Sequence, residues 1–275
     1  MNRKTTGIAL AAIALAGAAQ GQIDYNTASG PDDIEVESYV YTEWDGGFEF
    51  HTSFGTDFGY LDTEEFFKPT RTTIVDNFNL NAADYPSIDQ LDSTVELTGE
   101  TRSDFFEFSW DLAYRADFAD SIDTSGASEL FISTVRTYGP QGIRLRFDED
   151  TQIRISLDVE LGGMVGEELG SAGVLSNLAV FTFGGDALPN AFSAGAGVAS
   201  DLGSSFTGDF DVAAGDELDL TFWIDNFMET GAVLTDGFTD LDQTNRGTLT
   251  IEVIPAPASA SLLALGGLAA SRRRR

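Results

Sequence analysis

The sequence predicts an all-β fold, an antiparallel β-sandwich of jelly-roll type. Three observations carry this prediction. Apolar and polar residues alternate at every second position over many short segments. Turn-forming sequences, many of them among the 29 glycines, separate those segments. Between residues 22 and 254 no stretch shows a sustained helical period, apart from a turn or two expected near 86–91. Strands with one apolar face and short turns are typical of a sandwich.

The first predicted strands are 35–44 and 48–54, joined at the turn Asp45-Gly46-Gly47. Residues 106–114 form a further strand whose aromatic side chains gather on one face. The clearest predicted hairpin runs from Ile143 to Leu161, because apolar and polar residues alternate on both sides of Asp148-Glu149-Asp150.

Later strands are predicted at 206–212, 218–224 and 248–254, with a turn at 213–216. Residues 162–205 are rich in glycine and small residues, so we expect a long connection that holds one strand at 178–183. One sandwich domain over 22–254 is the favoured organisation, and two smaller β-domains divided near residue 165 are the alternative.

Residues 1–21 have the three parts of a secretory signal peptide. Arg3 and Lys4 precede an apolar run over 8–16, and Ala19-Gln20-Gly21 fits a small-x-small cleavage site. The alternative is a membrane helix, but the apolar run is shorter than the ~20 residues that a span requires. We therefore expect an exported protein that begins at Gln22.

The last 21 residues have three features in a fixed order. Pro255-Ala256-Pro257 ends the preceding strand, an Ala/Leu/Gly segment over 260–270 follows, and Arg272, Arg273, Arg274 and Arg275 close the chain. This end resembles the PEP-CTERM sorting signal of exosortase substrates, with Ala256 in place of the central glutamate. The resemblance implies cleavage by a membrane-embedded exosortase, transient membrane anchoring through an apolar helix, and a surface or extracellular destination.

The mature protein is strongly acidic. Removal of both ends leaves nine basic residues against 45 acidic ones, a net charge of about −36. Such a surface repels nucleic acid and anionic membranes. It favours solubility in a salty exterior, and binding of divalent cations by some carboxylates is the alternative interpretation.

No catalytic residue is predicted. The chain has no cysteine, and its single histidine, His51, lies within a predicted strand without a nucleophile-elbow sequence nearby. A secreted glycoside hydrolase requires two carboxyl groups held about 5–9 Å apart, and the sequence marks no such pair among its 45 acids. We therefore expect a protein that is not an enzyme, with the hydrolase as a further alternative.

Two sets of residues are candidates for binding. Asp240, Asp242 and Thr244 have the Asp-x-Asp spacing of oxygen-ligand calcium loops, so calcium is the one cofactor considered. Trp223 lies on the polar face of its strand, where an indole could stack on sugars or be covered by a loop. Arg144, Arg146 and Arg154 share the polar face of the predicted 143–161 hairpin, where they pair with local acids or clamp an acidic glycan.

These observations favour a structural or adhesive protein of the extracellular polysaccharide matrix, a setting that the PEP-CTERM resemblance implies. A carbohydrate- or calcium-binding module is the alternative. The expected partners are an exosortase and extracellular polysaccharide, with no nucleic acid.

We predict that mature protein lacks the tail from about Pro257 onward, because the Pro-Ala-Pro motif, apolar segment and arginine cluster together mark a removable anchor. Intact-mass spectrometry of protein released from the cell surface measures this directly. Released protein that still carries Arg272–Arg275 would contradict the prediction.

Overall fold

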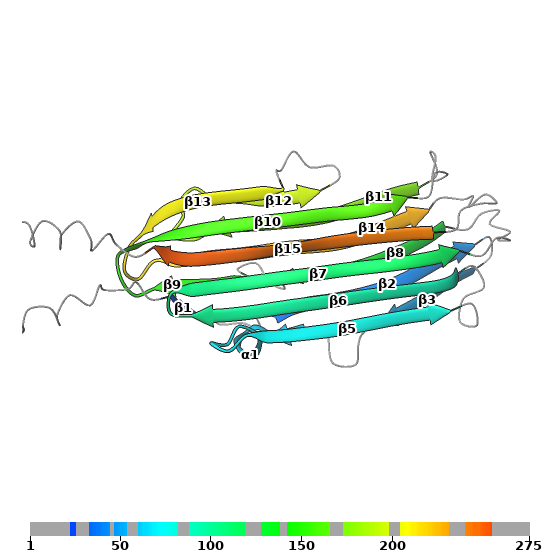
Figure 1. Cartoon of the computed structure of the whole chain (residues 1–275), viewed down its shortest axis with the longest axis horizontal. Coiled ribbons are helices and arrows are strands. Elements are labelled where there is room, and N and C mark those ends of the chain that lie inside the picture. The colour runs from blue at the N-terminus through cyan, green and yellow to red at the C-terminus, as the bar shows by residue number, and fades with distance from the viewer. Residues whose placement is uncertain are drawn as a thin grey trace, which may run out of the picture.

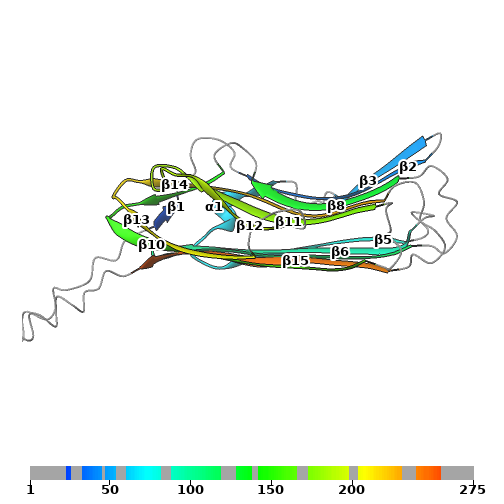
Figure 2. The same cartoon turned by 90° about the horizontal axis from the view of Figure 1, so that it is seen from above.

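The computed structural model is a sandwich of two antiparallel sheets, which confirms the predicted all-β fold. Figure 1 shows the long strands lying side by side, and Figure 2 shows the two sheets as separate layers. Every strand pairing between described residues is antiparallel. The structure describes residues 23–25, 33–44, 47–53, 60–81, 88–118, 128–137, 142–165, 173–197, 204–230 and 240–254.

The first sheet has nine strands, and in two places a pair of shorter strands lies end to end along one longer strand. Its members are β1 (Ile23–Tyr25), β2 (Asp33–Trp44), β3 (Gly47–Ser53), β4 (Tyr60–Asp62), β8 (Ser128–Thr137), β9 (Ile143–Phe147), β11 (Gly173–Gly184), β12 (Phe192–Gly197) and β14 (Glu217–Thr230). Strands β8 and β9 occupy successive parts of one edge of β14, while β11 pairs along its other edge. Likewise, β3 and β4 pair with successive parts of β2.

The second sheet has six strands in the order β13-β10-β15-β7-β6-β5. Their bounds are β5 (Thr72–Asn81), β6 (Ile88–Arg102), β7 (Phe105–Phe118), β10 (Thr151–Val165), β13 (Ser205–Val212) and β15 (Asp240–Ile254). Strands from before and after residue 165 pair with one another in both sheets. The described strands therefore form one sandwich, without the division near residue 165 that the alternative required.

The 143–161 segment is not a hairpin, contrary to the sequence prediction. Strand β9 belongs to the nine-stranded sheet and β10 to the six-stranded sheet, so Asp148–Asp150 carries the chain from one layer to the other. The turn at 213–216 makes a second crossing, from β13 to β14. The two crossings are hydrogen-bonded, because the Gly215 amide donates to the Phe147 carbonyl at 2.7 Å and the Ala214 amide donates to Asp150 Oδ1 at 2.8 Å.

Three further expectations are corrected by the structure. The 162–205 region holds the last residues of β10 and two paired strands, β11 and β12, rather than a long connection with one strand. Residues 88–91, where a helical turn was expected, belong to β6. Asp240–Gly247, expected to be a loop, is the first half of β15. The predicted β2–β3 hairpin is confirmed.

Aromatic rings from both sheets form the centre of the apolar core. Phe108 of β7 stacks on Phe222 of β14 with ring centroids 4.6 Å apart, and Trp110 meets Phe181 of β11 at 5.1 Å. Trp110 is 3% exposed, so the aromatic face of this strand lies in the core. Aromatic pairs of this kind stabilise a fold by about 0.5–1.5 kcal/mol beyond the area that they bury.

A short helix that the sequence did not reveal, α1 (Thr63–Phe66), closes one side of this core. Phe66 and the following Phe67 are almost fully buried, and Phe67 lies 4.8 Å from Phe106 between ring centroids. Gly99 of β6 leaves room for them, because a Cβ atom at this position would lie 2.5 Å from the Phe66 ring.

Four amide side chains interrupt the apolar core, and we call them the amide layer. They are Asn177 of β11, Asn226 of β14, and Gln243 and Asn245 of β15. Each is at most 4% exposed. Asn177 and Asn226 lie opposite each other in the nine-stranded sheet, while Gln243 and Asn245 face them from the six-stranded sheet. The two sheets are thus joined by polar as well as apolar contacts.

Both polar atoms of the Asn245 side chain form hydrogen bonds. Its Oδ1 accepts from the Trp110 indole N–H at 2.9 Å, and its Nδ2 donates to the carbonyls of Leu178 at 2.9 Å and Asp225 at 3.0 Å. Asn226 Nδ2 donates in the opposite direction, to the Leu112 carbonyl of the six-stranded sheet at 3.2 Å. The bonds to the carbonyls of Leu178, Asp225 and Leu112 cross between the sheets and fix their relative position, whereas the bond from Trp110 lies within the six-stranded sheet.

Asn245→Leu is expected to lower the free energy of unfolding by about 2 kcal/mol or more. The change leaves the Trp110 N–H without a partner and removes two hydrogen bonds to backbone carbonyls of the opposite sheet. A stranded buried polar group costs roughly 1–3 kcal/mol. Urea unfolding measures the difference. The matched control Asn77→Leu alters an exposed asparagine of β5 and should change stability by less than about 0.5 kcal/mol. Equal stability of the two variants would show that the bonds across the sheets contribute nothing.

Candidate functional site

Among the described residues of the nine-stranded sheet, one large aromatic side chain is exposed to solvent on the outer face. Along β14, Leu220, Phe222 and Ile224 are at most 4% exposed, whereas Trp223 between them is 49% exposed. The strand period thus places this indole on the outer face, as the sequence predicted. The preferred expectation, that a loop or the second sheet covers this indole, is wrong for the described part of the chain.

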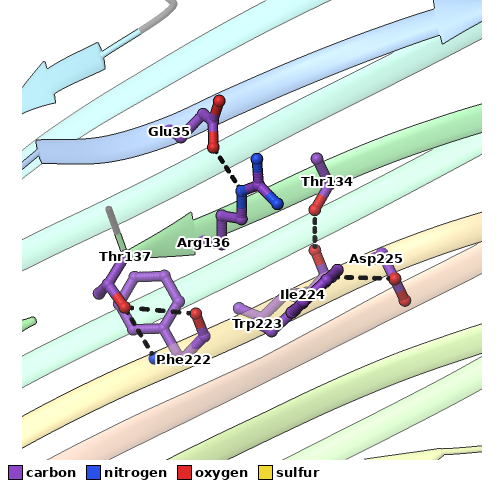
Figure 3. A network of polar contacts seen from close by, with 8 residues as sticks. All are labelled: Glu35, Thr134, Arg136, Thr137, Phe222, Trp223, Ile224 and Asp225. Carbon is purple, nitrogen blue, oxygen red and sulfur yellow. Dashed lines mark hydrogen bonds and ion pairs between the residues drawn. The ribbon is translucent and has the colours of Figure 1, made fainter. Parts of the chain in front are cut away.

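Three neighbouring strands contribute charged groups around this indole (Figure 3). Arg136 of β8 lies opposite Trp223 in register, and its guanidinium carbon lies 5.5 Å from the ring centroid. Arg136 also forms a hydrogen-bonded ion pair with Glu35 of β2. The indole N–H donates to Asp225 Oδ2 at 3.0 Å. The ring is therefore held in one orientation with about half of its surface open to solvent.

The backbone that carries Trp223 is supported from both sides of its sheet. On the outer side, the Thr134 hydroxyl of β8 donates to the Ile224 carbonyl at 3.3 Å. Thr137 bonds with Phe222, whose amide donates to the threonine hydroxyl at 3.2 Å. From the core side, Asn245 donates to the Asp225 carbonyl. Such a supported strand makes a rigid platform rather than a mobile loop.

Two carboxyl groups at this site are harder to ionise than usual. Burial raises the pKa of Asp225 to about 6, against a smaller lowering by the Trp223 N–H. Burial also raises the pKa of Glu37, assisted by the like charge of Glu35 and opposed by Arg136. Within this group Arg136 is the one cation beside three carboxyl groups, so the surface around Trp223 is acidic at neutral pH.

A half-exposed indole with carboxylate oxygens nearby has the chemistry to bind a sugar. The apolar face of a sugar ring packs on an aromatic ring, and its hydroxyl groups donate to carboxylates. The Arg136 guanidinium lies over one face of Trp223, and Val180 of β11 lies opposite Trp223 in register on the other side, so a ligand would contact the exposed part of the indole. The platform lies on a sheet surface, a geometry that suits an extended chain.

Sequence reasoning found Trp223 but missed Arg136, Glu35, Glu37 and Asp225. Asp225 could have been predicted from the sequence, since it lies two residues after Trp223 and so shares its strand face. Arg136 and Glu35 could not have been predicted, because the β2–β8 and β8–β14 pairings join segments roughly 90–100 residues apart. No local sequence pattern specifies such pairings.

The three arginines proposed as a clamp do not lie together. Arg144 and Arg146 belong to β9 in one sheet, and Arg154 belongs to β10 in the other. Arg144 pairs with Asp219 at 2.7 Å and Glu217 at 3.2 Å, and Arg154 pairs with Asp209 at 2.7 Å. Exposed Arg146 lies in register opposite Glu217. Pairing with acids on adjacent strands replaces the predicted pairing within the hairpin, and one clamp cannot include all three.

The candidate calcium ligands lie along an extended strand. Asp240, Asp242 and Thr244 occupy alternate positions of β15, in register with Asp117, Arg115 and Ala113 of β7. No group of three or more His, Cys, Asp or Glu residues suited to a metal is found within the described ranges. The expected loop is therefore wrong, and calcium binding stays a prediction.

Other expected features lie partly or wholly outside the residues that the structure describes. The backbone of His51 belongs to β3, where it lies opposite Val40. The signal peptide and the sorting residues Pro255–Pro257 and Arg272–Arg275 lie outside the described residues. In the part of the chain that is described, no helix has the length and apolar character to cross a membrane.

Comparisons with known proteins do not assign a family. No protein-family model matches the chain, and no curated protein matches it. Among solved structures, the VP2 subviral particle of infectious bursal disease virus covers 93% of this chain and 72% of its own, with 11% identity and a TM-score of 0.18. The structure of the Gx strain of that virus covers 88% of this chain and 81% of its own, with 9% identity and a TM-score of 0.15. Scores this low do not establish a shared fold.

Asp225→Asn should increase stability relative to the native protein as pH rises. The folded-state pKa of Asp225, about 6, exceeds its ordinary value of 3.8, so the folded protein binds this proton more tightly than the unfolded chain. That contribution is fully present below about pH 4 and is lost as pH rises through 6. Urea unfolding at pH 4 and pH 7.5 should show the variant gaining over the native protein at the higher pH.

Asp209→Asn is the control, because its pairing with Arg154 lowers the pKa of Asp209. Its effect should have the opposite sign, a loss of stability that appears once pH exceeds about 4. Carboxyl ¹³C NMR gives the Asp225 pKa directly, and a value near 4 would contradict the argument from burial.

Proposed function

We propose that this protein is an exported, non-enzymatic β-sandwich of jelly-roll type that adheres to extracellular polysaccharide through the surface around Trp223. An exosortase removes its C-terminal helix and directs it to the cell surface or the matrix. The setting is supported by the signal-peptide pattern and the PEP-CTERM resemblance. The single observation that supports the binding role is the indole of Trp223, 49% exposed and oriented by Arg136 and Asp225.

The charge around the indole points to the class of polysaccharide. Arg136 is already paired with Glu35, and Glu37 and Asp225 add further acidity. The mature chain carries about −36 charges, so an acidic glycan is repelled before contact. The ligand is therefore a neutral polysaccharide or one that carries protonated amines.

The flat arrangement of the site favours adhesion over hydrolysis. A glycoside hydrolase encloses the scissile bond between two carboxyl groups, whereas Trp223 stands on the face of a sheet between strands β8 and β11. Polysaccharide binding by one aromatic platform is weak for a single copy. Many copies on one surface raise the effective affinity, which suits a matrix protein.

Trp223→Ala should weaken binding to a neutral or amine-bearing polysaccharide by roughly 30-fold, or about 2 kcal/mol, since a tryptophan at the centre of a contact carries much of the binding energy. A glycan array identifies the ligand, and calorimetry with the purified protein gives the affinity. The matched control is Val75→Ala, which removes an equally exposed apolar side chain from the other sheet. Similar affinities for the two variants would place the binding surface elsewhere.

A further inference from the structure

The amide layer contains buried polar atoms without a protein partner. Gln243 is fully buried, yet neither its Oε1 nor its Nε2 has a hydrogen-bond partner. Asn177 Oδ1 and Asn226 Oδ1 also lack one, although the amide nitrogens of both residues are bonded. Ser93 of β6 is 2% exposed, and its Oγ atom also lacks a hydrogen-bond partner.

These atoms belong to one level of the sandwich. Gln243 and Ser93 both lie in register with Tyr114, so they occupy one row of the six-stranded sheet. Asn177 reaches this level from the other sheet, because its Nδ2 lies 3.4 Å from the carbonyl of Thr244, the residue next to Gln243. Asn226 is the register partner of Asn177.

We propose that ordered water molecules are enclosed between the two sheets at this level and bridge Gln243, Asn177, Asn226 and Ser93. Buried polar groups in folded proteins are almost always hydrogen-bonded, and internal waters commonly supply partners that the chain does not. Among the described residues, five of the seven buried side-chain atoms without a hydrogen-bond partner lie in this one layer.

The mixture of unpartnered groups selects water over an ion. The carbonyl oxygens of Asn177, Asn226 and Gln243 accept hydrogen bonds, the Gln243 amide nitrogen donates two, and the Ser93 hydroxyl does both. A cation would satisfy the oxygens and leave the amide nitrogen stranded. An anion would do the reverse. Water donates and accepts, so it can complete every group in the layer.

The described side chains of the amide layer are smaller than those of the aromatic part of the core. Facing positions in that aromatic part are filled by rings such as Phe108, Trp110, Phe181 and Phe222. In the amide layer the described side chains are those of asparagine, glutamine and serine, and Tyr114 lies in register between Gln243 and Ser93. Continuing across the nine-stranded sheet, the row of Asn177 and Asn226 passes through Ser133, Ser38 and Ser53 in register.

Water magnetic relaxation dispersion on the native full chain tests the proposal directly. We expect long-lived internal waters in the native protein and a smaller number in the Gln243→Met variant. The methionine side chain has a similar length to that of glutamine but lacks the amide group. The control Gln152→Met changes an exposed glutamine of β10 and should leave the internal waters unchanged. Absence of long-lived water in the native protein, or an unchanged number in Gln243→Met, would overturn the proposal.

The sign of a stability change gives a second, independent test. If waters bridge the layer, Gln243→Met strands their hydrogen bonds, and the melting temperature falls by several degrees. If the layer is dry, the same change removes an unsatisfied amide, and the melting temperature rises. A rise in melting temperature with potassium, sodium or calcium chloride, beyond the effect of matched choline chloride, that occurs in the native protein but not in Gln243→Met would instead assign the layer to a cation and refute the water model.

Discussion

The whole molecule depends on the two-residue period of its strands. Each strand places alternate side chains between the sheets, so a shift by one position would exchange every inner residue for an outer one. On β14 this period buries Phe222 and Ile224 and exposes Trp223. On β15 it buries Gln243 and Asn245 and leaves Asp242 in solvent. The exposed indole of Trp223 and the amide layer are both consequences of the same alternation.

Polar groups inside the sandwich make that register specific. An apolar core would tolerate sliding of one sheet over the other, because apolar contacts have little directional preference. Asn245 instead donates to two carbonyls of the opposite sheet at defined positions, and a displaced sheet would break both bonds. The strand that presents Trp223 is held by this same contact, so core and surface are linked through one asparagine.

The sequence was informative wherever a local pattern determined the outcome. Alternation revealed the strands, the aromatic face of β7 and the outward position of Trp223, and the Asp-Gly-Gly turn marked the β2–β3 hairpin. It was misleading where polar residues are buried, since Gln243 and Asn245 made the first half of β15 resemble a loop. It was silent on which sheet each strand joins, because the turn after Phe147 looks the same whether the chain returns to its own sheet or crosses over. Arg136 was missed as a site residue for that reason.

The position of β15 determines how the fold responds to mechanical load. This strand ends at Ile254, directly before the proposed sorting tail, and it lies between β7 and β10 over most of its length. Antiparallel hydrogen bonds run perpendicular to their strands, so tension applied at Ile254 along β15 shears both ladders together. An edge strand would peel away one bond at a time. A protein tethered through this end therefore transmits force into the middle of a sheet, where resistance is shared by many bonds.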